Sequence, residues 1–506
     1  MKPIVYNHNR FDGGMTHNKR DTSDLTKLGF ISHLDIYRDR NAMYVMPGYV
    51  SDNGFSGSAT GLKVYDVRAF GDIGSTDVIY ALGTKSDGTG SKIFEREISG
   101  SEWRVPTTNV HFAGEGSNNL TTYPFMYFVN ADFHYPVQNA GTTKVARHGA
   151  NAVGFYEGTW QNWLSTVTTG RTDAVLGFNL TTYLTKGGQS SGISSIDSSI
   201  VTVNAKTTGI TPTYIASGNY TIGIVGTSNV PRRSNLLIWD SQNLLADQNV
   251  SVGKGTAVAV GNPSGIWCVV MQSAFRDLEA NGQEEMVVKA LEGENVETLY
   301  RLPSVSGFTA WTDMYSLNDL YRDAMLWYGR VEVAPGEYVQ GIFGLGKSDI
   351  NSQFGVSLLL DTTSLGVVET ARLIGFSTYF AHNNDGSVSR LADFSTGVYN
   401  VPATIETLIY GSDFPYVKEL NGVSITTENL PSGASVVCYY RTDENNAWTS
   451  MGTSSEVGRQ KHNFTKKSDG TPVGKFEEIQ FKFVITGKVT IKNIFVKITP
   501  VADLSF

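Results

Sequence analysis

The chain has 506 residues, more than the roughly 250 to 300 that one compact core can hold, so we expect at least two domains, or a large repeat domain with a smaller one. Charged residues make up 17%, below the typical figure of about 25%, and the 53 glycines are roughly 10% of the chain against about 7% on average. Together with plentiful Thr, Ser, Val and Tyr, this favours an all-β protein with many turns. The net charge of −8 comes without an acidic block and argues against a nucleic-acid groove, which needs a basic stripe.

The first 30 residues contain NHNRFDGGMTHNKRDTSD, in which Asn, Asp and Gly crowd a segment with almost no apolar periodicity. Such residues favour turns and extended backbone over a packed element. We therefore predict an extended N-terminal arm over residues 1–30, stabilised by the surface on which it lies, and a partner for it. From Ile31 the sequence changes to alternating apolar runs that suit strands.

A repeated unit begins at residues 77–106, which read as a β-hairpin. An apolar run ends at Gly83, a Gly-rich polar turn follows, and a second strand-like run begins at Lys92. Copies recur to about residue 390 at spacings of roughly 30 to 50 residues, or about twice that, near the 40 to 50 of a four-stranded propeller blade. We predict a β-propeller of about six or seven blades over residues 31–400. Each copy's apolar run closes on a glycine, which we place on the innermost strand because side chains crowd at the axis. These glycines are Gly83, Gly177, Gly226, Gly261, Gly344 and Gly375.

After Val401 the pattern changes to longer, strictly alternating runs with a charged outer face, such as KELNGVSITTENL and VTIKNIFVKITP. About a hundred residues of such strands are typical of a β-sandwich. The predicted domains are therefore the arm, 1–30, the propeller, 31–400, and the sandwich, 401–506. Cys268 and Cys438 lie in apolar strand-like runs, so we expect two reduced core cysteines; a disulfide between distant strands is the alternative.

The segment GIFGLGKS at residues 341–348 matches the phosphate-binding pattern G-x-x-x-x-G-K-[ST], and Asp361 follows at a strand end. That chemistry requires a helix opening at Lys347, so that its N-terminal amides face the phosphates. Here DINSQFGVSLLLD leads directly into another strand. We therefore predict a blade hairpin, with a nucleotide site as the alternative.

Three further patterns have candidate chemistry. GQSSG at residues 188–192 matches the G-x-S-x-G nucleophile elbow, but its Ser- and Gly-rich flanks favour a loop. The eight histidines include no H-E-x-x-H and no paired Cys/His spacing, so we expect no metal and no cofactor. TDENNAWTSMG, with Asp443, Trp448 and Thr449, partly resembles the aspartate-box hairpin of sialidases, but it occurs once, in the predicted sandwich, so we favour a hairpin whose Trp covers the sandwich edge.

A glycosidase would need a pair of carboxylates as acid and nucleophile. Candidates near the edges of blade strands are Asp77, Asp173, Asp240 and Asp323. Loop aromatics that could stack on sugars are Trp160, Trp163, Trp311 and Tyr315, although most aromatic residues must be in the core. We assign no catalytic residue and predict no enzyme.

The opening NHNRFDGGMTHNKRDTSD, the blade-like YALGTKSDGTGSKIFER and the closing LNGVSITTENLPSGASVVCYYRTDENNAWTSMG with FEEIQFKFVITGKVTIKNI together resemble the propeller-type structural proteins of tailed bacteriophage virions. The resemblance covers most of the chain. It implies a virion component in the tail, its baseplate or tip, or the collar, and it implies no catalytic residues.

We therefore expect a tail-associated virion structural protein that assembles with other virion proteins and with symmetric copies of itself. Its N-terminal 25 residues are too polar for a signal peptide and no apolar stretch reaches 18 residues, so we expect it to be made in the host cytoplasm, with no membrane partner. Two alternatives stay open. One is a propeller that binds or cleaves a host surface glycan for attachment, and the other is a capsid decoration protein.

Overall fold

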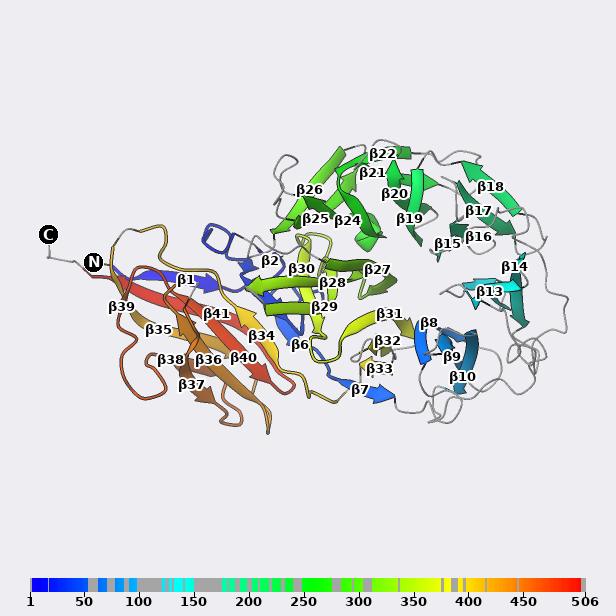
Figure 1. Ribbon diagram of the computed structural model, residues 1–506. Helices are drawn as coiled ribbons and strands as arrows, with labels where there is room; N and C mark the ends of the chain where they lie inside the picture. The colour runs from blue at the N-terminus through cyan, green and yellow to red at the C-terminus, as the bar shows by residue number, and fades with distance from the viewer. Residues whose placement is uncertain are drawn as a thin grey trace.

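The computed structural model describes residues 2–16, 18–52, 62–70, 78–85, 91–97, 121–122, 127–129, 132–139, 142–149, 175–179, 182–186, 192–197, 203–207, 210–217, 221–228, 233–239, 248–274, 284–293, 295–303, 312–334, 337–374, 377–383, 390–394, 397–414, 416–443 and 446–501. Regular structure in these residues is almost entirely β, with one short 3-10 helix, η3 (Pro263–Gly265). Figure 1 shows two bodies, a ring of sheets around an axis and a sandwich beside its rim. The predicted class, an all-β propeller with a C-terminal sandwich, is confirmed.

Seven sheets form the ring within the described residues, and consecutive strands build each of the first six. The first three blades contain β8 (Leu62–Phe70), β9 (Val78–Lys85), β10 (Ser91–Glu97); β11 (Thr121–Thr122), β12 (Tyr127–Val129), β13 (Asp132–Asn139), β14 (Thr142–Gly149); and β15 (Val175–Asn179), β16 (Thr182–Lys186), β17 (Gly192–Asp197), β18 (Val203–Thr207). The next three contain β19 (Ile210–Ser217), β20 (Ile222–Ser228), β21 (Arg233–Trp239), β22 (Gln248–Lys254); β23 (Thr256–Gly261), β24 (Trp267–Ala274), β25 (Glu284–Glu292), β26 (Asn295–Pro303); and β27 (Thr312–Tyr321), β28 (Ala324–Ala334), β29 (Glu337–Gly346), β30 (Gly355–Asp361). The predicted hairpin at residues 77–106 is confirmed, since β9 and β10 pair antiparallel.

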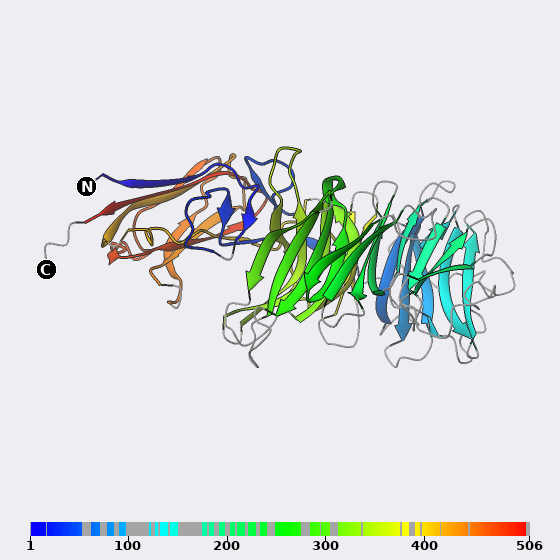
Figure 2. The same cartoon turned by 90° about the horizontal axis from the view of Figure 1, so that it is seen from above.

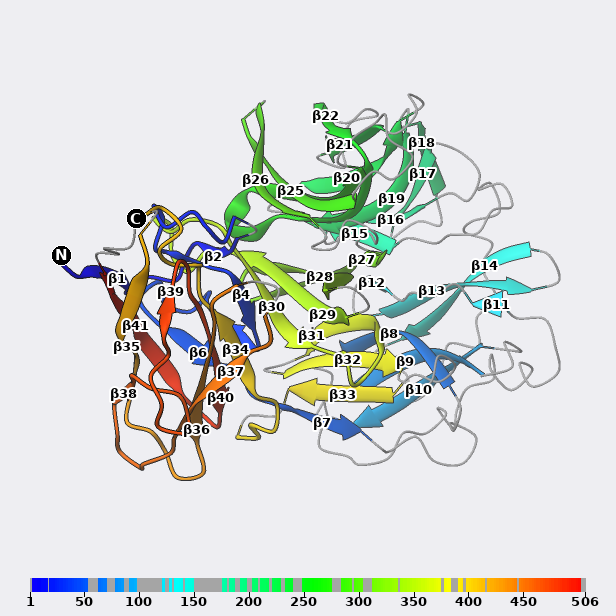
Figure 3. The same ribbon diagram turned by 60° about the vertical axis from the view of Figure 1, so that its left-hand side comes forward.

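The seventh blade takes its fourth strand from the other end of the propeller. It contains β31 (Val367–Ile374), β32 (Ser377–Asn383), β33 (Arg390–Phe394) and β7 (Tyr49–Asp52). The strand β7 pairs antiparallel with β33, and Figure 3 shows them side by side. Because β31 also contacts β8, the last sheet lies against the first, and the pairing of β7 with β33 holds both ends of the propeller in one blade.

The prediction that the repeat glycines lie on the innermost strands is confirmed for two of them and wrong for three. The innermost strands are the first strands of the blades, which contact one another from β15 through β19, β23, β27 and β31 to β8. Gly177 and Gly261 lie on such strands, but Gly83, Gly226 and Gly344 lie on β9, β20 and β29, and Gly375 lies outside the described residues. At Gly344 the reason is a specific neighbour: an added Cβ would lie 2.9 Å from the Tyr37 hydroxyl and from Leu359 Cδ1.

Two sheets with a shared apolar core form the sandwich. One contains β38 (Lys461–Phe464), β35 (Lys418–Thr427), β41 (Thr490–Pro500), β6 (Met43–Val45) and β5 (Leu34–Asp35), with β1 (Ile4–His8) on β41 and β39 (Lys475–Phe476) on β35. The other contains β4 (Phe30–Ser32), β34 (Ala403–Glu406), β40 (Gln480–Thr486), β36 (Ser435–Arg441) and β37 (Thr449–Ser454), and it continues through β30 into the sixth blade. A short parallel pair, β2 (Gly14–Met15) and β3 (Lys27–Leu28), lies beside β30.

The predicted domain boundaries need correction at the N-terminus. The segment predicted as an arm is extended, but it is part of the sandwich: β1 pairs with β41, and residues 31–46, predicted to open the propeller, supply β5 and β6 to the same sheet. Burial alternates along β1, where Tyr6 and His8 face the core. Two buried side chains in a segment rich in Asn and Gly gave too weak a period to detect in the sequence. The propeller is therefore an insertion between β6 and β34 of a sandwich built from both ends of the chain.

The insertion leaves its two junctions side by side. The backbone amide of Gly48 donates to the carbonyl of Val398 at 2.5 Å, and the Asn400 side chain donates to the carbonyl of Tyr49. Figure 2 shows the propeller edge-on with the sandwich at its rim. The strand patterns match these surroundings: β30 is buried almost throughout because it is covered on both faces, whereas β36 alternates strictly.

Candidate functional site: the joint between sandwich and propeller

The joint is a continuous sheet rather than a linker alone. Ser32 of β4 pairs in parallel with Leu358 of β30, and on its other side β4 pairs with β34 of the sandwich. The next residue, His33, donates its backbone amide to the Leu358 carbonyl at 2.8 Å and accepts from the amide of Met46 at 3.1 Å. The orientation of the two bodies is thus set by backbone hydrogen bonds.

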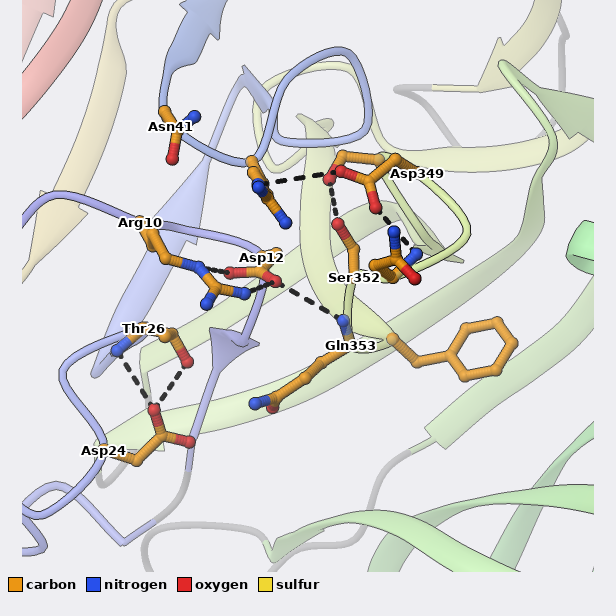
Figure 4. A network of polar contacts seen from close by, with 12 residues as sticks. Arg10, Asp12, Asp24, Thr26, Asn41, Asp349, Ser352 and Gln353 are labelled. Atoms are coloured by element: carbon orange, nitrogen blue, oxygen red, sulfur yellow. Dashed lines mark hydrogen bonds and ion pairs between the residues drawn. The ribbon is translucent and has the colours of Figure 1, made fainter.

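A network of polar side chains lies along one side of this sheet (Figure 4). Arg10 donates through Nη2 to Oδ2 of Asp12 at 2.6 Å, and the backbone amide of Gln353, in the turn between β29 and β30, donates to the same oxygen at 3.4 Å. The Asp12 side chain is fully buried, so its hydrogen bonds offset the cost of removing a carboxylate from water. Arg40 Nε lies 3.8 Å from Oδ2 of Asp349 in the same turn, an exposed pair that contributes little.

Two buried tyrosines connect the N-terminal segment to the blades. The hydroxyl of Tyr300, on β26, donates to the carbonyl of Gly13 at 2.6 Å and also contacts the carbonyl of Phe354. The hydroxyl of Tyr37 lies 3.0 Å from the Ser357 hydroxyl of β30. Burial raises the pKa of both phenols, so they remain neutral hydrogen-bonding groups at physiological pH.

The closest backbone approach in this joint is at Gly14, which has φ +65°. A Cβ at Gly14 would lie 2.5 Å from the Val356 backbone nitrogen, so any other residue would push β2 away from β30. Gly14 is therefore required by packing against the sixth blade, whereas a Cβ at Gly13 would meet Thr26 and Lys27 of the N-terminal segment itself.

A buried carboxylate, that of Asp35, forms a further contact between the sandwich and the propeller. Asp35, at the end of β5, accepts from the amide of Tyr37 at 2.9 Å and pairs with Arg322 Nε at 2.8 Å, in the turn between β27 and β28. The Tyr321 hydroxyl donates to it at 3.2 Å. Burial raises the pKa of Asp35, and the Arg322 guanidinium opposes that rise. This pair joins the sandwich to the sixth blade through a buried carboxylate and a half-exposed guanidinium.

Two buried histidines lie in the N-terminal segment. Burial lowers the pKa of His33 to about 4, and that of His8 to about 4. The Nε2 of His8 lies 2.7 Å from the hydroxyl of Tyr410, beneath β1. Both rings are thus neutral at physiological pH, and acidification would charge them inside the fold.

The structure places the sequence candidates in structural roles wherever it describes them. Residues 341–346 belong to β29, which forms a hairpin with β30, and Asp361 pairs with Gly341, so the predicted blade hairpin is confirmed. The Lys347 ammonium lies 4.5 Å from the centre of the Phe354 ring. Cys268 and Cys438 are both buried and free, as predicted.

Among the carboxylate candidates, only Asp323 is described. It sits at φ +66° between β27 and β28, and its Oδ2 accepts from the amide and the hydroxyl of Ser264 of the neighbouring blade. The other three, Asp77, Asp173 and Asp240, lie outside the described residues, as do Trp160, Trp163, Trp311, most of the GQSSG segment and the side chain of Tyr315. Trp448 lies immediately before β37, the edge strand of its sheet, and covers Arg441 and Lys482, in agreement with the predicted sandwich-edge hairpin; Asp443 is exposed.

In the described part of the chain, no three His, Cys, Asp or Glu side chains are placed to hold a metal ion. Within the same residues, no helix has the length and hydropathy needed to cross a membrane. The sequence reasoning missed the joint residues Asp12, Asp35 and Tyr300. Only the Gly13–Gly14 pair gave a local signal of close backbone approach.

Comparison with known proteins gives likenesses of fold only. No family model matches the chain, and no curated protein matches it in sequence. Similar solved structures include the Pan2 WD40 domain of Neurospora crassa, with 10% identity, 72% of this chain and 98% of that chain covered and a TM-score of 0.40. YCF48 from Cyanidioschyzon merolae has 10% identity, covers 68% and 98%, and has a TM-score of 0.42. An exo-beta-1,3-galactanase from Phanerochaete chrysosporium has 11% identity, covers 89% and 100%, and has a TM-score of 0.27.

Proposed function

We propose that this chain is a structural component of a tailed bacteriophage virion, associated with the tail, and that it acts by protein–protein assembly with other virion proteins and with copies of itself. The sequence resemblance to propeller-type virion proteins motivates the class. The observation that carries the assembly role is the joint: a sheet that runs from the sixth blade through β4 into the sandwich, supported by the pair between the buried Asp35 carboxylate and Arg322.

A rigid joint favours this role for a thermodynamic reason. A part that is tiled into an assembly loses less conformational freedom on binding when its own surfaces are already fixed relative to one another. Here the propeller rim and the far end of the sandwich are held at one distance by backbone pairing and buried side chains. The unit therefore acts as a spacer between whatever contacts its two ends.

Electron cryo-microscopy of purified particles, with quantitative mass spectrometry of their proteins, tests the proposal. We expect the chain at a fixed stoichiometry, in symmetric copies on the tail. Density on the capsid surface instead would favour the decoration alternative. Absence from particles, together with binding of the free chain to host surface glycan, would contradict the proposal and favour the attachment alternative.

A further inference from the structure

Two unlike surfaces lie at the end of the sandwich farthest from the propeller, where β1 begins and β41 ends (Figure 1). We name the first the end cap; it comprises Asp413, Phe414, Tyr416, Glu419 and Glu477. We name the second the cationic face; it comprises Tyr439, Arg441, Trp448 and Lys482. Each combines aromatic rings with charges of one predominant sign.

The end cap is built around a buried lysine. Lys418 has 0% exposure, and its ammonium donates to the carbonyls of Phe414 at 2.6 Å, Tyr416 at 2.6 Å and Glu477 at 2.7 Å. These three bonds use all the donors of the ammonium. Burial lowers the pKa of Lys418, which shows that the site is costly for a charge. The backbone carbonyls of Phe414, Tyr416 and Glu477 are thus held in place before any partner arrives.

Two of the residues held by Lys418 display aromatic side chains. With their carbonyls bound to Lys418, Phe414 and Tyr416 remain 41% and 51% exposed. Thr22 donates its hydroxyl to Oδ2 of Asp413 at 2.6 Å, which supports the loop from the N-terminal segment. Rigid, exposed aromatic residues are the side chains that carry most binding energy at protein interfaces.

Acidic groups predominate around these rings. The acidic side chains in and around the end cap are Asp21, Asp413, Glu419, Glu477 and Glu478, and the cations are Arg20, Lys475, which is opposite Glu419, and the buried Lys418. Arg20 pairs with Glu478 at 3.0 Å. The net electrostatic potential around Phe414 and Tyr416 is therefore negative, and it fits a partner that presents cations to these two rings.

The cationic face has the complementary chemistry. Arg441 Cζ lies 4.4 Å and Lys482 Nζ 4.7 Å from the centre of the Trp448 ring, and Lys482 also lies 5.4 Å from the centre of the Tyr439 ring. The strands β36 and β40 hold these side chains in register, with Tyr439 opposite Lys482. Its acidic neighbours are Asp443 on the same loop and Glu406, which is opposite Lys482 on β34 and lies 3.7 Å from the Lys19 ammonium.

From this complementarity we infer that the end cap of one copy docks on the cationic face of a second copy of this chain. The two surfaces are neighbours, because Arg441 pairs with Gln480, two residues from Glu478, so a twofold axis between two copies would form both contacts at once. Forming both contacts brings the buried area closer to the roughly 800 Å² per partner of a stable interface. The inference deepens the proposed assembly role by naming a partner surface, but its test does not require the particle.

Sedimentation of the full chain tests this pairing with charge reversals. The end-cap variant is Glu419→Lys/Glu477→Lys, and the face variant is Arg441→Glu/Lys482→Glu. We expect the unchanged chain to dimerise, each variant alone to lose dimer affinity by at least about tenfold, and an equimolar mixture to form heterodimers, because the reversed surfaces match each other. Glu456→Lys is the matched control: its side chain is 69% exposed, at the opposite end of β35, and dimerisation should be unchanged.

A second pair of variants avoids the risk of misfolding at the cationic face. Phe414→Ser/Tyr416→Ser changes only exposed side chains and should abolish the dimer, whereas Val457→Ser, at a residue that is 64% exposed elsewhere, should not. A monomeric unchanged chain, or dimers that survive both end-cap variants, would overturn the pairing. Incorporation into particles is measured separately. If the chain is found in particles but is monomeric on its own, only the inferred pairing is wrong. If the chain dimerises but is absent from particles, only the proposed function is wrong.

Discussion

The propeller and the sandwich are assembled from the chain in opposite ways. Blades such as β8–β9–β10 are made of strands that follow one another, so each sheet forms from one stretch of sequence. The sandwich pairs its first strand with its last, Ile4 with Ile498, and receives β4, β5 and β6 from a segment that precedes the whole propeller. Local pairing closes short loops, whereas the sandwich cannot be complete until both chain ends have met.

This difference assigns a distinct task to the N-terminal segment. It completes the sandwich, and it also reaches the fifth and sixth blades through Tyr300, Ser357 and Arg322. A single apolar core runs through both bodies at this place, and it contains Phe380 of the propeller as well as Phe483 of the sandwich. The two regions therefore differ in topology but share their stabilising interior.

The largest expected effect tests that shared interior. Phe380→Ala and Phe483→Ala each remove a fully buried ring, and each should lower the free energy of unfolding by about 3–5 kcal/mol. Because the core is continuous, calorimetry should show one transition that moves in both variants. Two transitions, of which each variant moves only its own, would show that the bodies unfold independently.

The second-largest expected effect is a fall in the free energy of unfolding at acidic pH, caused by the two buried histidines of the N-terminal segment. His8 and His33 have pKa values of about 4 in the fold, below the ordinary value of 6.5, so the unfolded chain binds more protons as the pH falls. Their contribution is fully present above pH 6.5 and is lost between there and pH 4, at about 1.4 kcal/mol per pH unit for each ring.

Urea unfolding across this pH range measures the effect. His33→Asn should remove about one proton from the pH slope, and asparagine tolerates the φ of +60° found at this position. His8→Asn, beneath β1, is the matched comparison and should remove a similar part. A slope unchanged in both variants would show that other groups cause the acid sensitivity.

The two regions also explain which features could be predicted from sequence. The hairpins β9–β10 and β29–β30 were predicted because an apolar run, a turn and a second run are adjacent in the chain. The same local reasoning favoured the hairpin over a phosphate site at Lys347, since the sequence after Lys347 leaves no room for a helix before the next strand. The strand β1 was not predicted as part of the sandwich, because its partner β41 lies at the other end of the chain.

The contacts of the joint could not be predicted from the sequence for a related reason. Asp12, Asp35 and Tyr300 are single polar residues with ordinary neighbours, and their roles arise only when blades five and six meet the N-terminal segment. Gly14 was visible as a turn residue, but its positive φ and its close approach to Val356 depend on a strand more than three hundred residues away. Contacts between distant segments leave no period in a single sequence.

A smaller loss is expected from removing Arg322, the half-exposed partner of the buried Asp35 carboxylate. Arg322→Ala leaves the Asp35 carboxylate buried with fewer donors and should cost about 1–3 kcal/mol. Arg459→Ala removes an arginine of similar exposure from its pair with the exposed carboxylate of Glu456 and should cost less than about 1 kcal/mol. Equal losses in the two variants would mean that Asp35 finds other partners when Arg322 is absent.

The smallest effect isolates one hydrogen bond of the joint. Tyr37→Phe keeps the ring that packs beside Gly344 but removes the hydroxyl that lies 3.0 Å from Ser357 Oγ, and should cost about 0.5–1.5 kcal/mol. Because both hydroxyls are buried, Ser357→Ala should lose a similar amount, and the double variant should lose less than the sum of the two. That coupling would assign the stability to the bond between sandwich and blade, whereas strictly additive losses would assign it to each hydroxyl's separate surroundings.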